Sequence, residues 1–413
     1  MKKFVVCSIL GVLLISLGVY SCGGNGNNVT DSDTTKPPVV VEDEDIPPTT
    51  LKVFIDASGS MRDYFGKEDI QNITDALSGA KQAVETLDAE YYVWGDTVHK
   101  IASSELTDKL IDKNLRGKAS TFDKIFEEMT QMAGKDTLTM LLSDGIISST
   151  PLQTKKSESF TDYDKGNLTN AIQKALKSKG KAVSIYRMKG NFNGNYLNKG
   201  NKPVPYQGER PFFIFVLGEP ENVRYFDLKV RNGEIEEVYK DAEAIYIGTA
   251  PKMNFLIEPA DGKDDMASAE DFEREEGTKE YKYTGTQGFR IKAEIPKWIK
   301  DSYSNSMIKD MSVIEIDGKP QNNIKVTIDD NYMIFDISEK IVEGLQDRQK
   351  KWTIRYIMTD PALKGWEKYS TDDDTTPDAE KTYLLIDLIQ AIHKGVTGGQ
   401  SSLLEAEITI IPQ

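Results

Sequence analysis

The stretch Val53–Met61, "VFIDASGSM", joins an apolar run to an aspartate and to two serines that flank a glycine. Leu51–Ile55 is short and largely apolar and ends at Asp56, a pattern typical of a buried parallel strand. Small oxygen-bearing residues gain little from burial or packing. A run of them directly after such a strand therefore indicates that their oxygens converge on a ligand.

After this strand, the apolar pattern alternates between helix and strand as far as about residue 235. Apolar residues between Ile73 and Leu87 recur at intervals of three and four, which predicts an amphipathic helix. Tyr91–Trp94 and Val98–Ile101 flank a Gly-Asp-Thr turn and predict a hairpin. The same reasoning predicts helices at Phe122–Met132 and Leu168–Leu176, strands at Leu138–Leu142, Val183–Tyr186 and Phe212–Leu217, and a long Gly/Asn loop at Asn191–Gln207.

Strands that alternate with helices predict an α/β fold with a doubly wound, mostly parallel sheet. In such sheets, ligands bind outside the carboxyl ends of the strands. Asp56 follows one predicted strand, and Asp144 follows another, in the sequence Leu-Leu-Ser-Asp-Gly. We therefore expect the two carboxylates to lie at the same edge of the sheet.

The residue types at this edge predict a metal site. Asp56, Ser58 and Ser60 alternate in a tight turn, and Gly59 lets the backbone bend close to an ion. Carboxylates and hydroxyls are the ligands of a hard cation such as Mg²⁺, and Mn²⁺ accepts the same set. In the alternative reading the aspartates only cap helices and the serines fill a turn. The agreement of all segments with their expected places favours the metal.

These segments resemble the metal-ion-dependent adhesion site of a von Willebrand factor type A (VWA) domain, over residues 51–235. The shared features are Asp-x-Ser-Gly-Ser after a first strand, a loop threonine, and Ser-Asp-Gly after a later strand. The family usually has Gly-x-Thr or Gly-Gly-Thr where this chain has Ala-Ser-Thr. Alignment on Phe122 and Phe126 puts Ser120 in the ligand place, so Ser120 is the alternative to Thr121. The resemblance implies a VWA/Rossmann-like sheet and a cation held by Asp56, Ser58, Ser60, Thr121 and Asp144.

Two carboxylates and a set of hydroxyls leave a bound dication with at least one coordination position for water. That position is open to an acidic side chain of a partner protein. The sequence thus predicts a divalent-cation-dependent protein-binding or adhesion module rather than an enzyme. An envelope assembly factor in the periplasm, recruiting another protein through the same site, is the alternative.

Enzymes that form an aspartyl-phosphate also place an aspartate after a first strand with Mg²⁺. They need a second acid or base nearby, and here position 58 is serine. The only histidines, His99 and His393, lie outside the predicted edge, and no Ser-His-Asp or Cys-His grouping can be assembled. A Mg²⁺-dependent phosphohydrolase is therefore the less favoured interpretation.

Residues 1–21 have the pattern of an export signal: two lysines, an apolar stretch and small residues before Cys22. Val-Tyr-Ser-Cys resembles a bacterial lipobox, which predicts a lipid anchor on Cys22 in the cell envelope, at the outer membrane. The membrane face stays open, and ordinary cleavage or an uncleaved anchor are the alternatives. Residues 22–50 predict a flexible tether. Cys7 leaves with the signal, so Cys22 has no disulfide partner.

The chain is acidic, with a formal net charge of −15. Cleavage after residue 21 removes two lysines and no acid, which leaves 49 basic and 66 acidic residues and a net charge of −17. Such a balance disfavours nucleic acid as a partner and also disfavours electrostatic docking on anionic lipid. Membrane attachment would come from the lipid on Cys22.

Residues 240–413 predict a mainly β, sandwich-like domain to which we assign no chemistry. Its acidic runs, Ala260–Glu276 and Ser370–Asp378, predict solvated loops, with a Ca²⁺ site at Asp372–Asp374 as the alternative. Trp298, Trp352 and Trp366 predict core packing rather than a carbohydrate platform. The expected elements are a helix at Tyr383–Val396 and strands at Ala244–Ile247, Met253–Ile257, Phe289–Ala293, Val313–Ile316, Ile324–Ile328, Tyr332–Ile337, Thr353–Met358 and Ala406–Ile411.

Overall fold

The structure is a computed structural model of the 413-residue chain. It describes residues 47–66, 70–84, 89–95, 97–111, 121–147, 162–176, 180–199, 202–235, 237–248, 255–258, 266–274, 278–296, 299–300, 303–346, 351–359, 362–399 and 402–413. All of them belong to the second of the two units into which the chain divides, Glu42–Gln413. The predicted signal and most of the tether, with Cys22, lie outside the described residues, as do Ser120 and Trp298.

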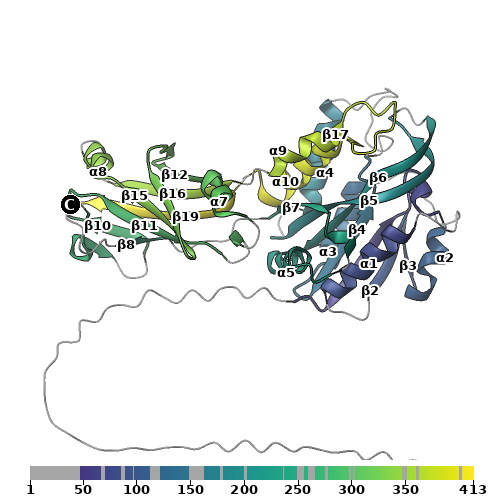
Figure 1. The fold of residues 1–413 in the computed structure, drawn as a ribbon, viewed down its shortest axis with the longest axis horizontal. Coiled ribbons are helices and arrows are strands. Elements are labelled where there is room, and N and C mark those ends of the chain that lie inside the picture. Colours follow the sequence, from purple (N-terminus) through teal and green to yellow (C-terminus); the bar gives the residue numbers. More distant parts are fainter. Residues whose placement is uncertain are drawn as a thin grey trace, which may run out of the picture. The chain divides into compact units, whose positions relative to one another are not determined.

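Seven strands form one mixed sheet in the order β3-β2-β1-β4-β6-β5-β7 (Figure 1). β1 lies between β2 and β4 and is parallel to both, and the four other pairings are antiparallel. The α/β class is confirmed, but a mostly parallel sheet is wrong. The bounds are β1 Thr50–Asp56, β2 Ala89–Trp94, β3 Val98–Ile101, β4 Thr137–Ser143, β5 Ala182–Leu197, β6 Pro203–Gly218 and β7 Glu243–Ile247.

The sheet is mixed because the chain returns by hairpins on both sides of the parallel centre. β2 and β3 form the hairpin that the sequence predicts. β5 and β6 pair along their whole lengths, from Ala182↔Gly218 to Leu197↔Pro203. The loop predicted at Asn191–Gln207 is therefore wrong: this stretch is mostly a two-stranded ribbon. Buried residues such as Phe192 and Tyr196 alternate with exposed ones, as in a strand, but the glycines and asparagines between them make this alternation hard to recognise in the sequence.

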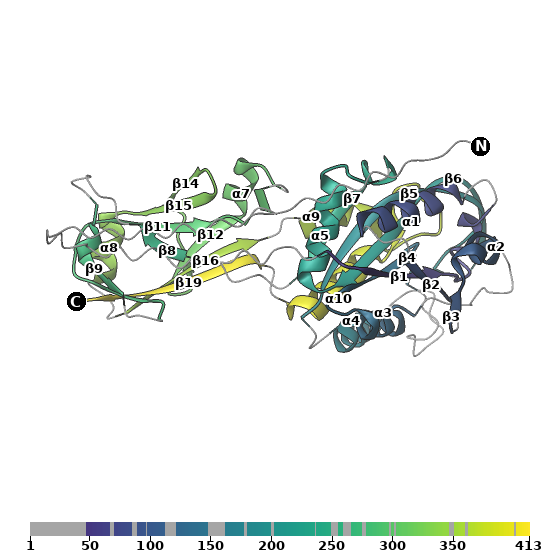
Figure 2. The same ribbon diagram turned by 90° about the horizontal axis from the view of Figure 1, so that it is seen from below.

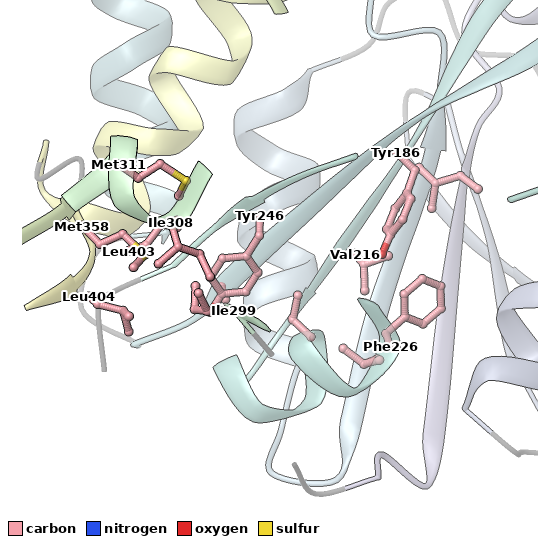
Figure 3. Close-up of a cluster of buried hydrophobic side chains, with 14 of the residues drawn as sticks. Tyr186, Val216, Phe226, Tyr246, Ile299, Ile308, Met311, Met358, Leu403 and Leu404 are labelled. Atoms are coloured by element: carbon pink, nitrogen blue, oxygen red, sulfur yellow. The ribbon is translucent and has the colours of Figure 1, made fainter. Parts of the chain in front are cut away.

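Helices cover both faces of this sheet (Figure 2). The face that carries Val53 and Ile55 packs against α1 and α5, and the face that carries Phe54 packs against α3, α4 and α10. Figure 3 shows Tyr186, Val216 and Phe226 in the first of these layers. The four helices predicted for this part of the fold are confirmed as α1, α3, α4 and α10. The sequence analysis did not predict α2 and α5. The bounds are α1 Gln71–Ala83, α2 Leu106–Ile111, α3 Phe122–Met132, α4 Asp162–Leu176, α5 Pro220–Arg231 and α10 Leu385–Thr397.

Two further sheets, of six and four strands, contain the strands predicted after residue 250. Tyr356 of the first contacts Phe255 and Phe335 of the second, with ring centroids 6.2 and 5.3 Å apart. The six-stranded sheet is β9 Phe272–Arg274, β10 Glu280–Tyr283, β12 Ser312–Ile316, β13 Lys319–Pro320, β16 Trp352–Thr359 and β19 Ser402–Pro412, and the four-stranded sheet is β8 Phe255–Glu258, β11 Phe289–Glu294, β14 Lys325–Asp329 and β15 Tyr332–Ile337. Two short helices, α7 Asn305–Met311 and α8 Glu339–Gln346, accompany them.

The segment between β16 and β19 packs with the seven-stranded sheet. It contains α9 (Ala362–Trp366), two short strands, β17 (Ser370–Thr371) and β18 (Thr382–Tyr383), and α10. Leu385, Leu388 and Ile392 of α10 are buried in the layer that holds α3 and α4. The sequence analysis includes both β7 and α10 in residues 240–413. In the structure β7 is a strand of the seven-stranded sheet, and α10 packs on one face of that sheet.

The two tryptophans in the described residues of this half, Trp352 and Trp366, are 0% and 3% exposed, which confirms their prediction as core residues. Phe272–Arg274 of the predicted acidic loop forms β9 instead.

Among the helices of the described ranges, none has both the length and the apolar character that crossing a bilayer requires.

Candidate metal centre

Asp56 and Asp144 lie at the carboxyl ends of two neighbouring parallel strands. Asp56 is the last residue of β1, and Asp144 follows Ser143, the last residue of β4. Their exposed fractions are 2% and 1%. The tertiary structure therefore brings together two acids that are 88 residues apart in the chain, as the alternation of strands and helices led us to expect.

Both carboxylate oxygens of Asp56 are held by the chain. The backbone N–H of Ser58 donates to Oδ1 at 2.8 Å, and the hydroxyl of Ser143 donates to Oδ2 at 2.7 Å. The Ser143 hydroxyl in turn accepts the N–H of Gly145 at 3.2 Å. The sequence analysis missed Ser143 as a site residue. Its signal was its place in the Ser-Asp-Gly segment, directly before Asp144.

The two oxygens of Asp144 differ. Oδ1 accepts the backbone N–H of Ile146 at 3.0 Å, whereas Oδ2 is buried and has no hydrogen-bond partner among the described residues. Burial, and then the charge of Asp56, raise the pKa of Asp144 to about 7, against the opposing effects of the Ile146 N–H, the Ser60 hydroxyl and Arg210. An unpartnered buried carboxylate oxygen is costly unless a cation or a donor satisfies it.

Ser58 and Ser60, the serines of the Asp-x-Ser-Gly-Ser segment (the first motif), lie in the same cluster of oxygens as Asp56 and Asp144. The Ser58 and Ser60 hydroxyl oxygens are 3.0 Å apart, with Ser58 buried and Ser60 half-buried. The Ser60 hydroxyl also favours the ionised form of Asp144 and opposes the rise of its pKa. Four of the predicted ligands, Asp56, Ser58, Ser60 and Asp144, thus lie in one cluster of oxygens.

Thr121 is the N-cap residue of α3 and is half-buried. Its carbonyl accepts the N–H groups of Lys124 and Ile125, and its side chain makes no capping hydrogen bond. The hydroxyl is therefore not committed to the helix end. Ser120 lies outside the described residues, so the choice between these two residues stays a prediction.

Gly145 fixes the path of the chain after Asp144. Its φ is +70°, a conformation that residues with a side chain rarely adopt. A Cβ at this position would also lie 2.8 Å from the Phe213 ring. The Ser-Asp-Gly sequence thus needs its glycine both for the turn and for close packing on β6.

The β5–β6 ribbon is attached to the turn that follows Ser60. Asp63 accepts the backbone N–H of Asn195 at 2.7 Å, and the Tyr64 hydroxyl donates to the carbonyl of Pro211 at 2.8 Å. A Cβ added at Gly59 would lie 3.3 Å from Cδ1 of Leu197. The ribbon therefore packs directly on the first motif.

The acidic run at 370–378 packs on the same ribbon. Asp374 is 3% exposed and accepts the Tyr196 hydroxyl at 2.5 Å and the Lys199 N–H at 2.8 Å. The predicted solvated loop is therefore wrong for Asp374, although Asp373 is exposed and forms an ion pair with Lys199 at 3.0 Å. Because protein donors occupy both oxygens of Asp374, this arrangement does not favour the alternative Ca²⁺ site.

The histidines have other surroundings. His99 is exposed on β3, with its Nε2 2.9 Å from the Thr97 hydroxyl. His393 is half-buried on α10, and burial lowers its pKa. Neither imidazole is among the largest influences on the pKa of Asp144.

The cluster has the donor chemistry of a hard-cation site. Its members are carboxylate and hydroxyl oxygens, and the buried Oδ2 of Asp144 has no hydrogen-bond partner among the described residues. Across the described part of the chain no group of three or more His, Cys, Asp or Glu residues could hold a metal. A site here would accordingly depend on serine and threonine hydroxyls beside its two acids.

No protein-family model, curated protein or solved structure matches this chain. The likeness to VWA domains rests on the motifs.

Proposed function

We propose that this chain is a membrane-tethered, divalent-cation-dependent protein-binding module in which the metal takes a carboxylate from a partner protein. The observation that carries the proposal is the buried Oδ2 of Asp144, which has no hydrogen-bond partner in the part of the chain that the structure describes and which belongs to a cluster with Asp56 and two serine hydroxyls. Mg²⁺ or Mn²⁺ would satisfy this oxygen. The residues that would hold the cation are Asp56, Ser58, Ser60 and Asp144, together with Thr121 or Ser120.

The chemistry that the cation supplies is electrostatic binding of an anionic oxygen. Asp56 and Asp144 together balance the two charges of the ion, and hydroxyls fill part of its coordination shell without adding charge. A carboxylate of the partner can then replace a water. Binding would depend both on the cation and on one acidic residue of the partner.

We further propose a VWA-like, Rossmann-like fold for residues 51–235 and a β-sandwich for the later sheets. Three adjacent parallel strands with helices on both faces support the first proposal. Aromatic contacts between the six-stranded and four-stranded sheets support the second. The lipid on Cys22 and the tether would hold the module at the outer membrane of a bacterial envelope.

Recovery of a partner from envelope extract tests the proposed function. The lipidated chain in detergent is used as bait with Mg²⁺ and with EDTA, beside the variants Asp56→Ala and Asp241→Ala. Asp241 is an exposed acid outside the site and serves as the matched control. We expect one protein to be retained with Mg²⁺ and released by EDTA. Asp56→Ala should lose it and Asp241→Ala should keep it.

A partner whose retention ignores both EDTA and Asp56→Ala would contradict the proposal. Calorimetric titration of the same proteins with Mn²⁺ provides a separate readout of the metal. Uptake by the wild type and Asp241→Ala, but not by Asp56→Ala, is the expected result.

A further inference from the structure

A buried arginine lies at the same edge of the sheet as the candidate ligands. Ser143, the last residue of β4, pairs with Phe213 of β6. Arg210 precedes Phe213 by three residues, and because the two strands are antiparallel this places Arg210 past the end of β4. Asp144 directly follows Ser143. β6 thus carries Arg210 into the region where the chain turns through Asp144 and Gly145.

The guanidinium of Arg210 is enclosed by the ribbon and by the acidic run. The side chain is 1% exposed, and its Cζ lies 4.2 Å from the centre of the Tyr196 ring. Its Nη1 donates to the carbonyl of Asp378 at 3.1 Å, whereas Nε and Nη2 have no hydrogen-bond partner among the described residues. Arg210 is therefore a buried positive charge that has the Asp378 carbonyl and the Tyr64 hydroxyl beside it.

The charge of Arg210 acts on the site. Among the groups that shift the pKa of Asp144, Arg210 is the positive charge, and it favours the ionised carboxylate. The phenols of Tyr64 and Tyr196 respond to both Arg210 and Asp144, so these four residues share one electrostatic environment. Because Arg210 is buried at the same edge of the sheet, water screens its charge little.

We propose that Arg210 is a built-in counter-cation of the metal site, which offsets the repulsion between Asp56 and Asp144 when no metal is bound and weakens the site's affinity for a divalent cation. The inference rests on the proposed function, because it concerns the same site. The physical reason is that one positive charge both stabilises the two acids and repels an incoming cation. Metal binding would then depend more strongly on cation concentration than the two acids alone would imply.

Arg187 offers a closely matched control. It lies on β5, its Cζ is 4.1 Å from the centre of the Tyr369 ring, and its Nη2 donates to the carbonyl of Glu380 at 3.2 Å. Each arginine therefore stacks on a tyrosine and holds a carbonyl between β17 and β18. Arg210, unlike Arg187, is among the largest influences on the pKa of Asp144.

The experiment is calorimetric titration of Mn²⁺ into the full chain at pH 8, comparing the wild type with Arg210→Met and Arg187→Met. We expect Arg210→Met to bind Mn²⁺ about tenfold more tightly than the wild type, because a nearby positive charge is lost. Arg187→Met should bind as the wild type does. Damage to the fold alone would weaken binding, so the sign of the change separates the two explanations.

Two more variants keep the inference testable if Arg210→Met does not fold. Arg210→Gln is also neutral but can still donate to the Asp378 carbonyl, and it should tighten binding as well. Arg210→Lys keeps the charge and should bind Mn²⁺ like the wild type. Tighter binding by Arg210→Lys would show that lost packing, not lost charge, is responsible, and would overturn the inference.

The outcomes separate this inference from the proposed function. If the wild type binds Mn²⁺ and the neutral variants, Arg210→Met and Arg210→Gln, bind it equally or more weakly, the role of Arg210 is overturned. The proposed metal site is then still supported. Uptake by the neutral variants alone supports the role of Arg210 and overturns the metal-dependent function of the natural chain. No uptake by any of these proteins overturns both.

Discussion

Asp56 and Asp144 occupy equivalent places at the ends of neighbouring strands, but their surroundings differ. Asp56 has a hydrogen bond to each oxygen, from the Ser58 N–H and the Ser143 hydroxyl. Asp144 has a backbone donor at one oxygen and no hydrogen-bond partner in the described residues at the other. The cost of burying a charge at this edge therefore falls mainly on Asp144.

This asymmetry predicts a pH dependence of the metal-free protein. A carboxyl pKa of about 7 in the folded state, against 3.8 as its ordinary value, means that the folded state binds the proton more tightly. Stability is then lost as the pH rises from about 4 to about 7. Asp144→Asn is neutral at all pH values and should be more stable than the wild type at pH 8 in EDTA, by on the order of 2–4 kcal/mol.

Urea unfolding in EDTA at pH 4 and at pH 8 measures this difference. Asp227, whose pKa burial raises to about 6, contributes in the same direction in both proteins. The readout is therefore the gap between variant and wild type, which should widen as the pH rises. A gap that stays constant between the two pH values would contradict the prediction, and Mn²⁺ should stabilise only the wild type.

Gly145→Ala should destabilise the protein and weaken metal uptake. The residue would need a φ of +70° and would place its Cβ 2.8 Å from Phe213, at an expected cost of about 2–4 kcal/mol. Gly180→Ala is the control, since its φ is +59° but no atom of the described residues lies within 4 Å of a Cβ placed there. Chemical denaturation should show the larger loss for Gly145→Ala, and equal losses would mean that packing on β6 is unimportant.

At the scale of elements, the β5–β6 ribbon joins the first motif to the acidic run. Asp63 and Tyr64 attach it on one side, and Asp374 attaches it on the other. Gly and Asn residues in the ribbon disfavour a strand by their own propensity. Tertiary contacts therefore decide that these residues pair.

Asp374→Ala should loosen the ribbon. It leaves the buried Tyr196 hydroxyl and the Lys199 N–H without their acceptor, at an expected cost of about 2–3 kcal/mol. Asp373→Ala in the same run removes an exposed carboxylate and should have little effect. Hydrogen exchange of residues 192–210 would measure the change, and equal protection in the two variants would contradict this account.

The crossing of α10 and α4 depends on Gly395. A Cβ there would lie 3.0 Å from Leu176 Cδ1 and 3.3 Å from the Ile172 carbonyl oxygen. We expect Gly395→Ala to lower the free energy of unfolding by about 1–3 kcal/mol, because the helices cannot approach as closely. Gly344→Ala in α8, where no described residue lies within 4 Å of an added Cβ, should instead raise the free energy of unfolding by about 0.5–1 kcal/mol. Thermal and urea unfolding of both variants would test the opposite signs.

At the scale of the whole molecule, the chain leaves the seven-stranded sheet after β7 and returns to it with α10. It then ends in β19, which lies between β16 and β10 in the six-stranded sheet. Residues near the C-terminus are thus required by the sheet that begins at Thr50. The predicted boundary near residue 240 does not separate the chain into segments that each complete their own core.

A fragment of residues 47–248 tests this consequence. It lacks α10, so Ile172, Leu176 and the other residues that α10 covers would be exposed to water. We expect the fragment to bind a hydrophobic dye and to unfold with low cooperativity, compared with the full chain. Cooperative melting at the temperature of the full chain would show that α10 is dispensable.

The sequence by itself determined the kind and order of most elements and identified four oxygen-bearing residues that the fold brings into one cluster. The helix from Gln71, the hairpin at β2–β3 and the strands that end at Asp56 and Ser143 follow from local periodicity, which neighbouring residues control. Asp56 and Asp144 could be assigned to one edge because the connectivity of parallel strands requires it.

Only the tertiary structure decided the direction of the outer strands, the length of the ribbon and the surroundings of Asp144. The pairing of β4 with β6, the burial of Asp374 and the place of Arg210 all depend on contacts between residues far apart in the chain. No local pattern records such contacts. An arginine followed by a proline and two phenylalanines predicts a strand end, but its role as a buried charge depends on which acids the fold brings near it.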